Sequence, residues 1–222
     1  AWAPAASGQS EAQLTTPHER PPTHSWMPRP TVAPAGVIQH CGPWVRDGYK
    51  SIQVNVDARG CNIIGDAANE PSIAVDPTDP RKIVIGWRQF DSVLSDFRQA
   101  GWAYSHDGGR TWTFPGVLDP GVFHSDPVLA ADGDGNFYYH SLTTDESTYW
   151  CYVFKSADGG QSWSNGVYAY GGDKAWMAID RTGGIGDGNL YAAWDYAGCC
   201  GENWFNRSTN GAASFEPPVP VP

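Results

Sequence analysis

The sequence predicts an all-β protein made of repeated small sheets, and its composition and an internal repeat support this fold class. Of its 222 residues, 13% are aromatic and only 17% are charged, and it contains 26 glycines and 18 prolines. Coiled coils and helical bundles have a different composition, because they need long, charged helices rich in Leu and Ala. Hydrophobic residues reach 41%, which is too high for a wholly disordered chain. Short strands joined by many turns fit this composition best.

An eight-residue motif recurs at a nearly constant spacing. It reads SHDGGRTW at Ser105–Trp112 and SADGGQSW at Ser156–Trp163, and a degraded third copy is Ser208–Phe215. The Asp can accept backbone N–H groups of its own hairpin, and the glycines allow a positive φ. We therefore expect the motif to be a structural turn without a catalytic role. Its structural residues are Ser105, Asp107, Gly109 and Trp112, repeated as Ser156, Asp158, Gly160 and Trp163.

Each motif lies between the third and fourth strands of a unit of four expected strands, and the fourth strand starts at its Trp or Phe. The innermost strands are expected at Pro71–Asp76, Pro127–Asp132 and Ala175–Asp180, and the second strands at Lys82–Trp87, Asn136–Leu142 and Asn189–Trp194. Four strands per roughly 50 residues is the period of a β-propeller blade. Three blades are predicted, at 69–119, 120–171 and 172–222. A closed propeller needs about four to eight blades. We therefore expect part of a six- or seven-bladed propeller: a fragment of a longer one, a processed half, or a subunit that a second chain completes.

The chain before the blades divides into two predicted parts. Residues 1–36 contain seven prolines and little hydrophobic periodicity, which indicates an arm or linker. Residues 37–68 are expected to lead into the blades and to contribute an outer strand, Ser51–Asp57, to a closing blade. The opening AWAPAASG has no charged n-region and no long apolar run, as in a mature chain after removal of a signal peptide.

The five cysteines favour an oxidising compartment, and hence a secreted or cell-surface protein. They are Cys41, Cys61, Cys151, Cys199 and Cys200. None forms a CxxC pair, so a zinc ribbon is not expected. Cys41 and Cys61 can close one short segment. Either of the adjacent Cys199 and Cys200 could reach Cys151, or the two could bond to each other, and the odd number leaves one thiol over.

The repeated motif S-x-D-x-G-x-[ST]-W resembles the Asp-box, or bacterial neuraminidase repeat, of sialidase-like β-propellers. The resemblance covers about residues 51–217, and three segments are similar to secreted bacterial proteins of this type: NEPSIAVDPTDPRKIVIGWRQFD, SDPVLAADGDGNFYYHSL and GGDKAWMAIDRTGG. It implies a ligand over the propeller axis, on the face opposite the Asp-boxes. It also implies an acid/base aspartate after the second strand of the first blade, where Asp91 and Asp96 are the candidates.

The resemblance also limits the expected activity. Sialidases of this family carry an arginine in a Phe-Arg-Ile-Pro segment that enters the first blade. The matching segment here is Asn69–Ile73, and Glu70 stands in place of the arginine. An acid at this position repels the carboxylate of sialic acid, and the tyrosine–glutamate nucleophile pair of the family has no counterpart that can be placed. Sialidase activity proper is therefore not expected.

Candidate site residues lie in the loops that the topology places on the ligand face. Glu70 and Asp126 occupy the same place in successive repeats, just before the innermost strand, and should point to the axis. Paired carboxylates can act on a glycosidic bond, and His124 could instead abstract a proton beside a uronic acid carboxylate. The catalytic candidates are Glu70, Asp91, Asp96, His124 and Asp126; the substrate-binding candidates are Arg88, Arg98, Lys174, Trp176 and Tyr196.

Two functions follow as predictions. The first is action on, or binding of, extracellular glycans, with hydrolase or lyase chemistry on an acidic polysaccharide. The alternative is a non-catalytic propeller that binds an extracellular protein or builds an assembly. With 14 basic and 24 acidic residues, no nucleic-acid partner is expected, and without an apolar run of 18 residues no membrane span is expected. No cofactor is expected: the stretch Asp132–Asn136 looks like half a calcium loop, but a plain Asx turn is the preferred interpretation.

Overall fold

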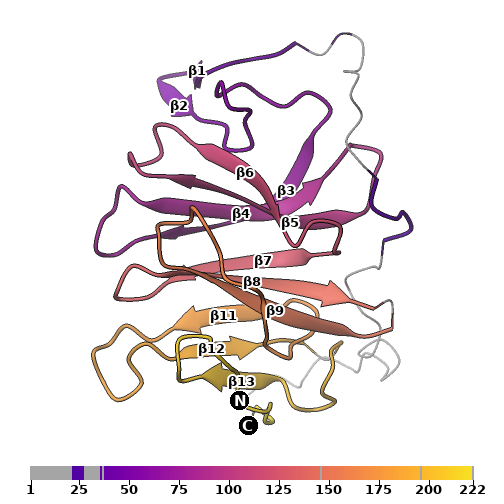
Figure 1. The fold of residues 1–222 in the computed structure, drawn as a ribbon, viewed down its shortest axis with the longest axis vertical. Helices are drawn as coiled ribbons and strands as arrows, with labels where there is room; N and C mark the ends of the chain where they lie inside the picture. Colours follow the sequence, from indigo (N-terminus) through magenta and orange to yellow (C-terminus); the bar gives the residue numbers. More distant parts are fainter. Residues whose placement is uncertain (1–21, 28–35, 37, 146, 196, 222) are drawn as a thin grey trace, which may run out of the picture.

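The computed structural model describes residues 22–27, 36, 38–145, 147–195 and 197–221. In this part of the chain the fold is all-β, as the sequence predicts. Two four-stranded sheets, one three-stranded sheet and a separate two-stranded hairpin make up the structure. The three larger sheets follow one another along the molecule in chain order (Figure 1). This arrangement is that of a partial propeller, with each sheet as one blade.

The first two blades have four antiparallel strands in simple up-and-down order. In the first blade the order is β3 (Ala67–Val75), β4 (Ile83–Phe90), β5 (Arg98–Ser105) and β6 (Thr113–Leu118). In the second it is β7 (Ser125–Ala131), β8 (Phe137–Thr144), β9 (Tyr149–Ser156) and β10 (Val167–Tyr168). The ladder of the innermost strand is interrupted at the same place in both, between Asn69 and Ser72 and between Ser125 and Val128.

The third blade has only three full strands. They are β11 (Trp176–Ile179), β12 (Leu190–Ala193) and β13 (Phe205–Ser208). In place of a fourth strand, Val219 forms a single bridge to Phe205, with its N–H donating to the Phe205 carbonyl at 2.8 Å. Pro218 and Pro220 flank Val219 and have no N–H to donate, so the pairing cannot extend.

The segment before the blades differs from the expected outer strand at Ser51–Asp57. The structure instead has a hairpin of β1 (Trp44–Arg46) and β2 (Tyr49–Ser51), which pairs with no blade. Residues 52–57 form a loop with one isolated bridge, from Val56 to Asn62. The Cys41–Cys61 disulfide closes this segment on itself, because Cys41 and Cys61 also face each other across a bridge.

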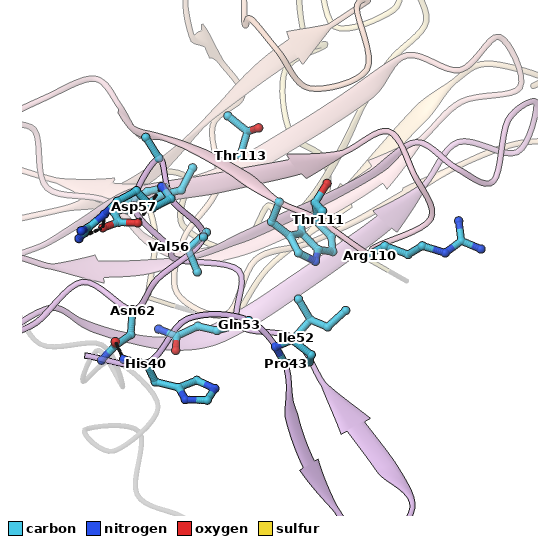
Figure 2. A pocket seen from close by; sticks show the side chains of 16 residues that line it. His40, Pro43, Ile52, Gln53, Val56, Asp57, Asn62, Arg110, Thr111 and Thr113 are labelled. Atoms are coloured by element: carbon cyan, nitrogen blue, oxygen red, sulfur yellow. Dashed lines mark hydrogen bonds and ion pairs between the residues drawn. The ribbon is translucent and has the colours of Figure 1, made fainter. Parts of the chain in front are cut away.

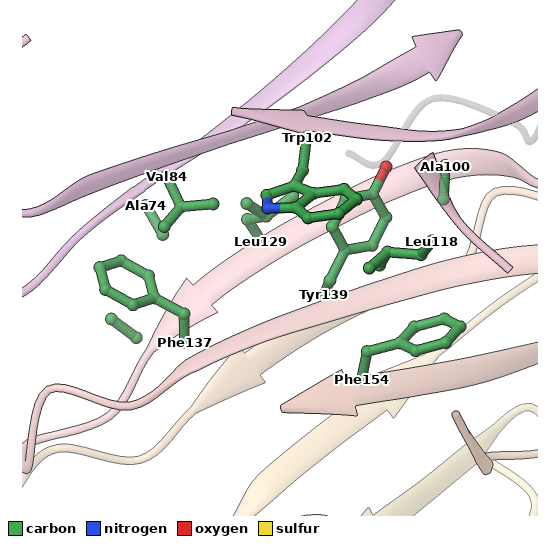
Figure 3. Packing of buried hydrophobic residues seen from close by; sticks show 10 residues of the cluster. Ala74, Val84, Ala100, Trp102, Leu118, Leu129, Phe137, Tyr139 and Phe154 are labelled. Carbon is green, nitrogen blue, oxygen red and sulfur yellow. The ribbon is translucent and has the colours of Figure 1, made fainter. Parts of the chain in front are cut away.

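The main core lies between the first and second blades. Trp102 and Val84 of the first blade pack in one cluster with Leu129, Phe137 and Tyr139 of the second (Figure 3). Val84, Phe137 and Tyr139 are fully buried. Full burial of an aliphatic or aromatic side chain stabilises the fold by about 1.5–3 kcal/mol. A second cluster, which includes Tyr138, Met177 and Leu190, joins the second blade to the third in the same way.

The Asp-boxes form hydrogen-bonded turns at one face of the blades. The Asp107 carboxylate accepts the Arg110 and Thr111 N–H groups at 2.9 and 3.0 Å and the Thr111 hydroxyl at 2.7 Å. These hydrogen bonds hold the pKa of Asp107 below its usual range. Asp158 repeats the arrangement with Ser162. Because each box carboxylate is occupied by its own turn, its observed role is structural.

Successive blades are joined through these boxes. The Trp102 indole N–H donates to the Gly160 carbonyl at 2.9 Å, so the second box sits on strands of the first blade. The box also lies beside the turn between a blade's first two strands, because the Gly108 N–H donates to the Arg81 carbonyl at 2.9 Å. Both kinds of turn therefore share one face, which leaves the start of each innermost strand at the opposite face.

Candidate functional site

The candidate site lies where the innermost strands of the three blades begin. Glu70, Asp126 and Lys174 occupy equivalent positions there and share an unusual backbone conformation, with φ of 49°, 45° and 52°. A residue with a side chain costs about 1–2 kcal/mol in this left-handed region. Such strain persists only where the surrounding structure enforces it, and it gathers at functional sites. The same kink in each of the three blades aims these side chains toward one place.

Ion pairs connect these side chains. Arg88, on β4, places its Nη2 2.6 Å from a Glu70 carboxylate oxygen and its Nη1 4.0 Å from Asp126. Its Nε donates to the side-chain oxygen of Asn69 at 2.9 Å. The Lys174 ammonium lies 3.2 Å from the other Asp126 oxygen. The cluster therefore alternates charges across the three blades, from Glu70 through Arg88 and Asp126 to Lys174.

A second arginine supports this cluster from inside the protein. Arg98 is buried, and its Nε lies 3.4 Å from the Ser125 hydroxyl, which donates to Asp126 at 3.0 Å. Its Nη1 donates to the Asp96 carbonyl at 2.8 Å, and its guanidinium lies 4.7 Å from the Phe123 ring centre. Burial lowers the pKa of Arg98, and the charge of Asp126 opposes that shift. Arg98 therefore positions Ser125 and Asp126 but does not reach the cleft.

The cluster faces a cleft of about 320 Å³. Apolar side chains and Ser72 line the rest of it: Pro71, Pro127, Val128, Ala175 and Trp176. Trp176 is 69% exposed, so its indole face is open to a ligand. Carboxylates can accept hydrogen bonds, the lysine can donate them, and the indole can stack on an apolar surface. A mostly apolar cleft with a few convergent polar groups is the usual form of a small-molecule site.

Asp91 and Asp96 lie elsewhere, in the loop between β4 and β5. The Asp96 carboxylate accepts four hydrogen bonds from the arm: Thr23 N–H at 2.8 Å, Thr23 hydroxyl at 2.6 Å, His24 N–H at 3.0 Å and His24 Nδ1 at 2.7 Å. Asp91 contacts Gln99, at 3.4 Å, and helps to line a separate hollow beside Trp26. Neither carboxylate lines the cleft, so the structure does not bring them together with Glu70 and Asp126.

His124 is completely buried. Its Nδ1 lies 3.1 Å from the Ser141 hydroxyl, its Nε2 lies 3.7 Å from Asp119, and its ring meets Phe154 edge to face. No ligand at the surface reaches this imidazole, so the geometry gives no support to a role in proton abstraction. Tyr196, the remaining binding candidate, lies outside the described residues.

The sequence reasoning missed the residues that precede the kinked positions. Asn69 accepts a hydrogen bond from Arg88, and Ser125 donates one to Asp126. Asn69 directly precedes Glu70, and Ser125 directly precedes Asp126. Asp173 has the same place in the third blade and is fully buried. The sequence contained a signal for these residues. When the repeats are aligned so that Glu70 and Asp126 match, Asn69, Ser125 and Asp173 also occupy one equivalent position.

A second hollow, of about 650 Å³, is separate from this site. It lies between the segment 40–62 and the first Asp-box and β6 (Figure 2). Part of its polar lining already bonds internally: Arg59 donates to Asp57 at 2.8 Å, and the Asn62 side-chain oxygen accepts the backbone N–H of His40. Asp57 is the one carboxylate among the described residues that line this hollow, so it lacks the paired carboxylates of the cleft.

The structure also places the candidate calcium loop and the five cysteines. The Asp132 carboxylate accepts the N–H groups of Asp134 and Asn136 at 3.0 and 2.9 Å, which is an Asx turn. The cysteines form Cys41–Cys61 and the adjacent pair Cys199–Cys200, and Cys151 is a buried free thiol. These disulfides indicate an extracellular environment. The described residues contain no helix that is long and apolar enough to cross a membrane.

Comparison with solved structures finds a similar fold in a sialidase. The chain is similar to the Hadza microbial sialidase Hz136, with a TM-score of 0.50 and 15% identity, over 70% of this chain and 34% of that one. An exo-beta-1,3-galactanase from Phanerochaete chrysosporium, solved with beta-1,3-galactotriose, matches with a TM-score of 0.45 and 10% identity, over 71% and 36% of the two chains. The chain thus spans about a third of the length of these two proteins.

A glycosyl hydrolase from Bacteroides ovatus also matches, with a TM-score of 0.43 and 15% identity, over 70% of this chain and 50% of that one. No protein-family model and no curated protein matches the sequence. At these identities the likeness concerns the fold, so the function has to be argued from the cleft itself.

Proposed function

We propose that this chain forms part of an extracellular glycan site, centred on the cleft between the starts of β3, β7 and β11. The observation that carries the proposal is convergence: Glu70, Asp126, Lys174 and Trp176 come from three blades and line one cleft, and Arg88 pairs with Glu70 beside it. Sugars need such a surface, because each ring presents hydroxyls at its edge and C–H groups on its faces. The carboxylates and the ammonium meet the hydroxyls, and the indole meets the C–H face.

Hydrolysis would use the same groups. A glycosidase needs two carboxyl groups on either side of the scissile bond. Glu70 and Asp126 are the pair of carboxylates that line the cleft. In this proposal they flank the sugar, while Arg88 and Arg98 keep them in place. Asp91 and Asp96 do not enter the proposal, because they face the arm.

The test combines a glycan array with an assay for release of reducing sugar. We expect the wild-type protein to bind at least one class of oligosaccharide, and Glu70→Gln to weaken that binding by about tenfold through loss of a charge-assisted hydrogen bond. Tyr49→Ala is the matched control, because Tyr49 is 80% exposed on the hairpin and away from the cleft. If no glycan is bound or cleaved, or if both variants behave alike, the proposal is wrong.

A second candidate function is a binding or assembly module without catalysis. Ile73 and Val75 of the innermost strand β3 are 58% and 42% exposed, and with Ile179 they line a groove of about 430 Å³. Exposed apolar surface of this kind fits contact with further protein. This candidate is favoured if the purified protein forms a stable oligomer and binds no glycan.

A further inference from the structure

We propose that the cleft selects an uncharged sugar residue and rejects sugars that carry a carboxylate. This inference rests on the proposed glycan site and narrows its ligand. It departs from the acidic polysaccharide that the sequence suggests. The argument depends on how the charges at the cleft are paired, on what the arginines already bind, and on the position of Trp176.

The charges at the cleft are balanced. Glu70 lies 2.6 Å from Arg88, and Asp126 lies 3.2 Å from Lys174. Each carboxylate therefore has a cation beside it, and each cation has a carboxylate. An anionic ligand has to displace Glu70 or Asp126 from its partner before it gains a contact of its own. A cationic ligand such as an amino sugar meets the same obstacle from Arg88 and Lys174.

Recognition of a sugar carboxylate normally uses an arginine that offers two parallel N–H groups. Arg88 does not offer them, because its Nη2 faces Glu70 and its Nε donates to Asn69 at 2.9 Å. Its side chain is only 14% exposed. Arg98 is buried behind Ser125. Among the described residues that line the cleft, the one cation is Lys174, and it is the partner of Asp126.

The charged side chains at the cleft can instead form hydrogen bonds with the hydroxyls of a neutral sugar. The Glu70 side chain is 43% exposed and the Lys174 side chain 54%, so both can exchange hydrogen bonds with a ligand while their ion pairs stay in place. Trp176 stands beside Lys174 with 69% of its surface exposed, and Pro71, Pro127 and Val128 make the other walls apolar. The volume of about 320 Å³ is at the lower end of the range for small-molecule sites, about 300–1,000 Å³. These dimensions fit a sugar ring stacked on the indole.

The test measures binding of three sets of oligosaccharides by calorimetry with the whole chain. They are neutral galacto-, gluco- and xylo-oligosaccharides, anionic sialyllactose and oligogalacturonate, and cationic chitosan oligomers. We expect binding from the neutral set alone, with an affinity that changes less than about twofold between low and high salt, because no net charge is neutralised. Trp176→Ala should weaken it by about tenfold, and the control Tyr49→Ala should not change it.

Glu70→Gln separates the two kinds of ligand by the direction of its effect. For a neutral sugar it removes a charged acceptor and weakens binding, whereas for an anionic sugar it removes a repulsion and strengthens binding. Salt-sensitive binding of sialyllactose or oligogalacturonate that Glu70→Gln strengthens, or a preference for chitosan, would overturn this inference and leave the glycan site intact. Absence of binding to all three sets would instead overturn the proposed function.

Discussion

At the scale of single residues, close approach between blades makes one Asp-box glycine less replaceable than another. Gly108 and Gly160 both belong to Asp-boxes and both have positive φ, of 76° and 88°. A Cβ on Gly108 would meet nothing within 4 Å, whereas one on Gly160 would lie 2.5 Å from a Val84 methyl and 3.1 Å from Tyr104. A glycine is therefore required at position 160 by packing as well as by backbone conformation.

This difference predicts unequal effects of the same substitution. Gly108→Ala should lower the free energy of unfolding by about 1–2 kcal/mol, the penalty for a Cβ in the left-handed region. Gly160→Ala should lower it by about 3 kcal/mol or more, because the strain of overpacking adds to that penalty. Urea denaturation of both variants measures the difference. Equal losses would show that the second box is not packed on the first blade.

Burial of a titratable side chain gives a second residue-scale prediction. His140, on β8, is fully buried, and burial lowers its pKa from 6.5 to about 4. The unfolded chain therefore binds a proton more readily than the folded one between these two values, so the fold loses stability as pH falls through 6.5 toward 4. The loss attributable to His140 should approach about 3 kcal/mol at pH 4.

Replacing the imidazole removes that sensitivity. The free energy of unfolding of His140→Gln should fall less steeply between pH 7 and pH 4.5 than that of the wild-type protein, whatever its value at pH 7. Parallel pH profiles would contradict the depressed pKa. His106→Gln is the control, because the His106 side chain is exposed, beside the Gly159 carbonyl.

At the scale of elements, the arm and the loop between β4 and β5 hold each other in place. The Asp96 carboxylate accepts both backbone N–H groups of Thr23 and His24. These hydrogen bonds keep the pKa of Asp96 well below its usual value of 3.8. The loop is also joined to the cleft, because Arg98 links the Asp96 carbonyl to Ser125. The arm is thus one end of a chain of contacts that runs to Asp126.

Removing the charge of Asp96 should release the arm. In Asp96→Asn, hydrogen exchange of the Thr23 and His24 amides should accelerate by about tenfold or more after correction for intrinsic rates. The depressed pKa means that protection in the wild-type protein is complete above pH 3.8 and is lost only as pH falls through the lower folded value. Asp145→Asn is the control, since Asp145 caps its own turn with Ser147. Unchanged exchange in Asp96→Asn would show that the arm is held by other contacts.

At the scale of the whole molecule, the sequence predicted the features that recur from blade to blade and missed the contacts that occur only once. The blade order, the Asp-box turns and the convergence of Glu70 with Asp126 follow from one periodic pattern, because equivalent positions in a repeat acquire equivalent places. The docking of Thr23 on Asp96 and the burial of His124 depend on contacts between unlike segments, for which a repeat carries no signal. The fourth strand of the last blade was overpredicted because its prolines limit the pairing to one bridge.

The stacked arrangement also predicts how the molecule unfolds. Among the described residues, the buried clusters between blades join blades that are adjacent in the chain: Leu190 lies in the cluster between the second and third blades, and Leu129 in the cluster between the first and second. Stability should then behave as a sum of blade and nearest-neighbour terms, as in other repeat proteins. Leu190→Ala, which costs about 2–5 kcal/mol, should accelerate hydrogen exchange in β11–β13 and leave β3–β6 protected. Leu129→Ala should accelerate exchange in β3–β6 and β7–β10 together. If Leu190→Ala instead raised exchange equally in all three blades, the molecule would be a single cooperative unit and the nearest-neighbour description would be wrong.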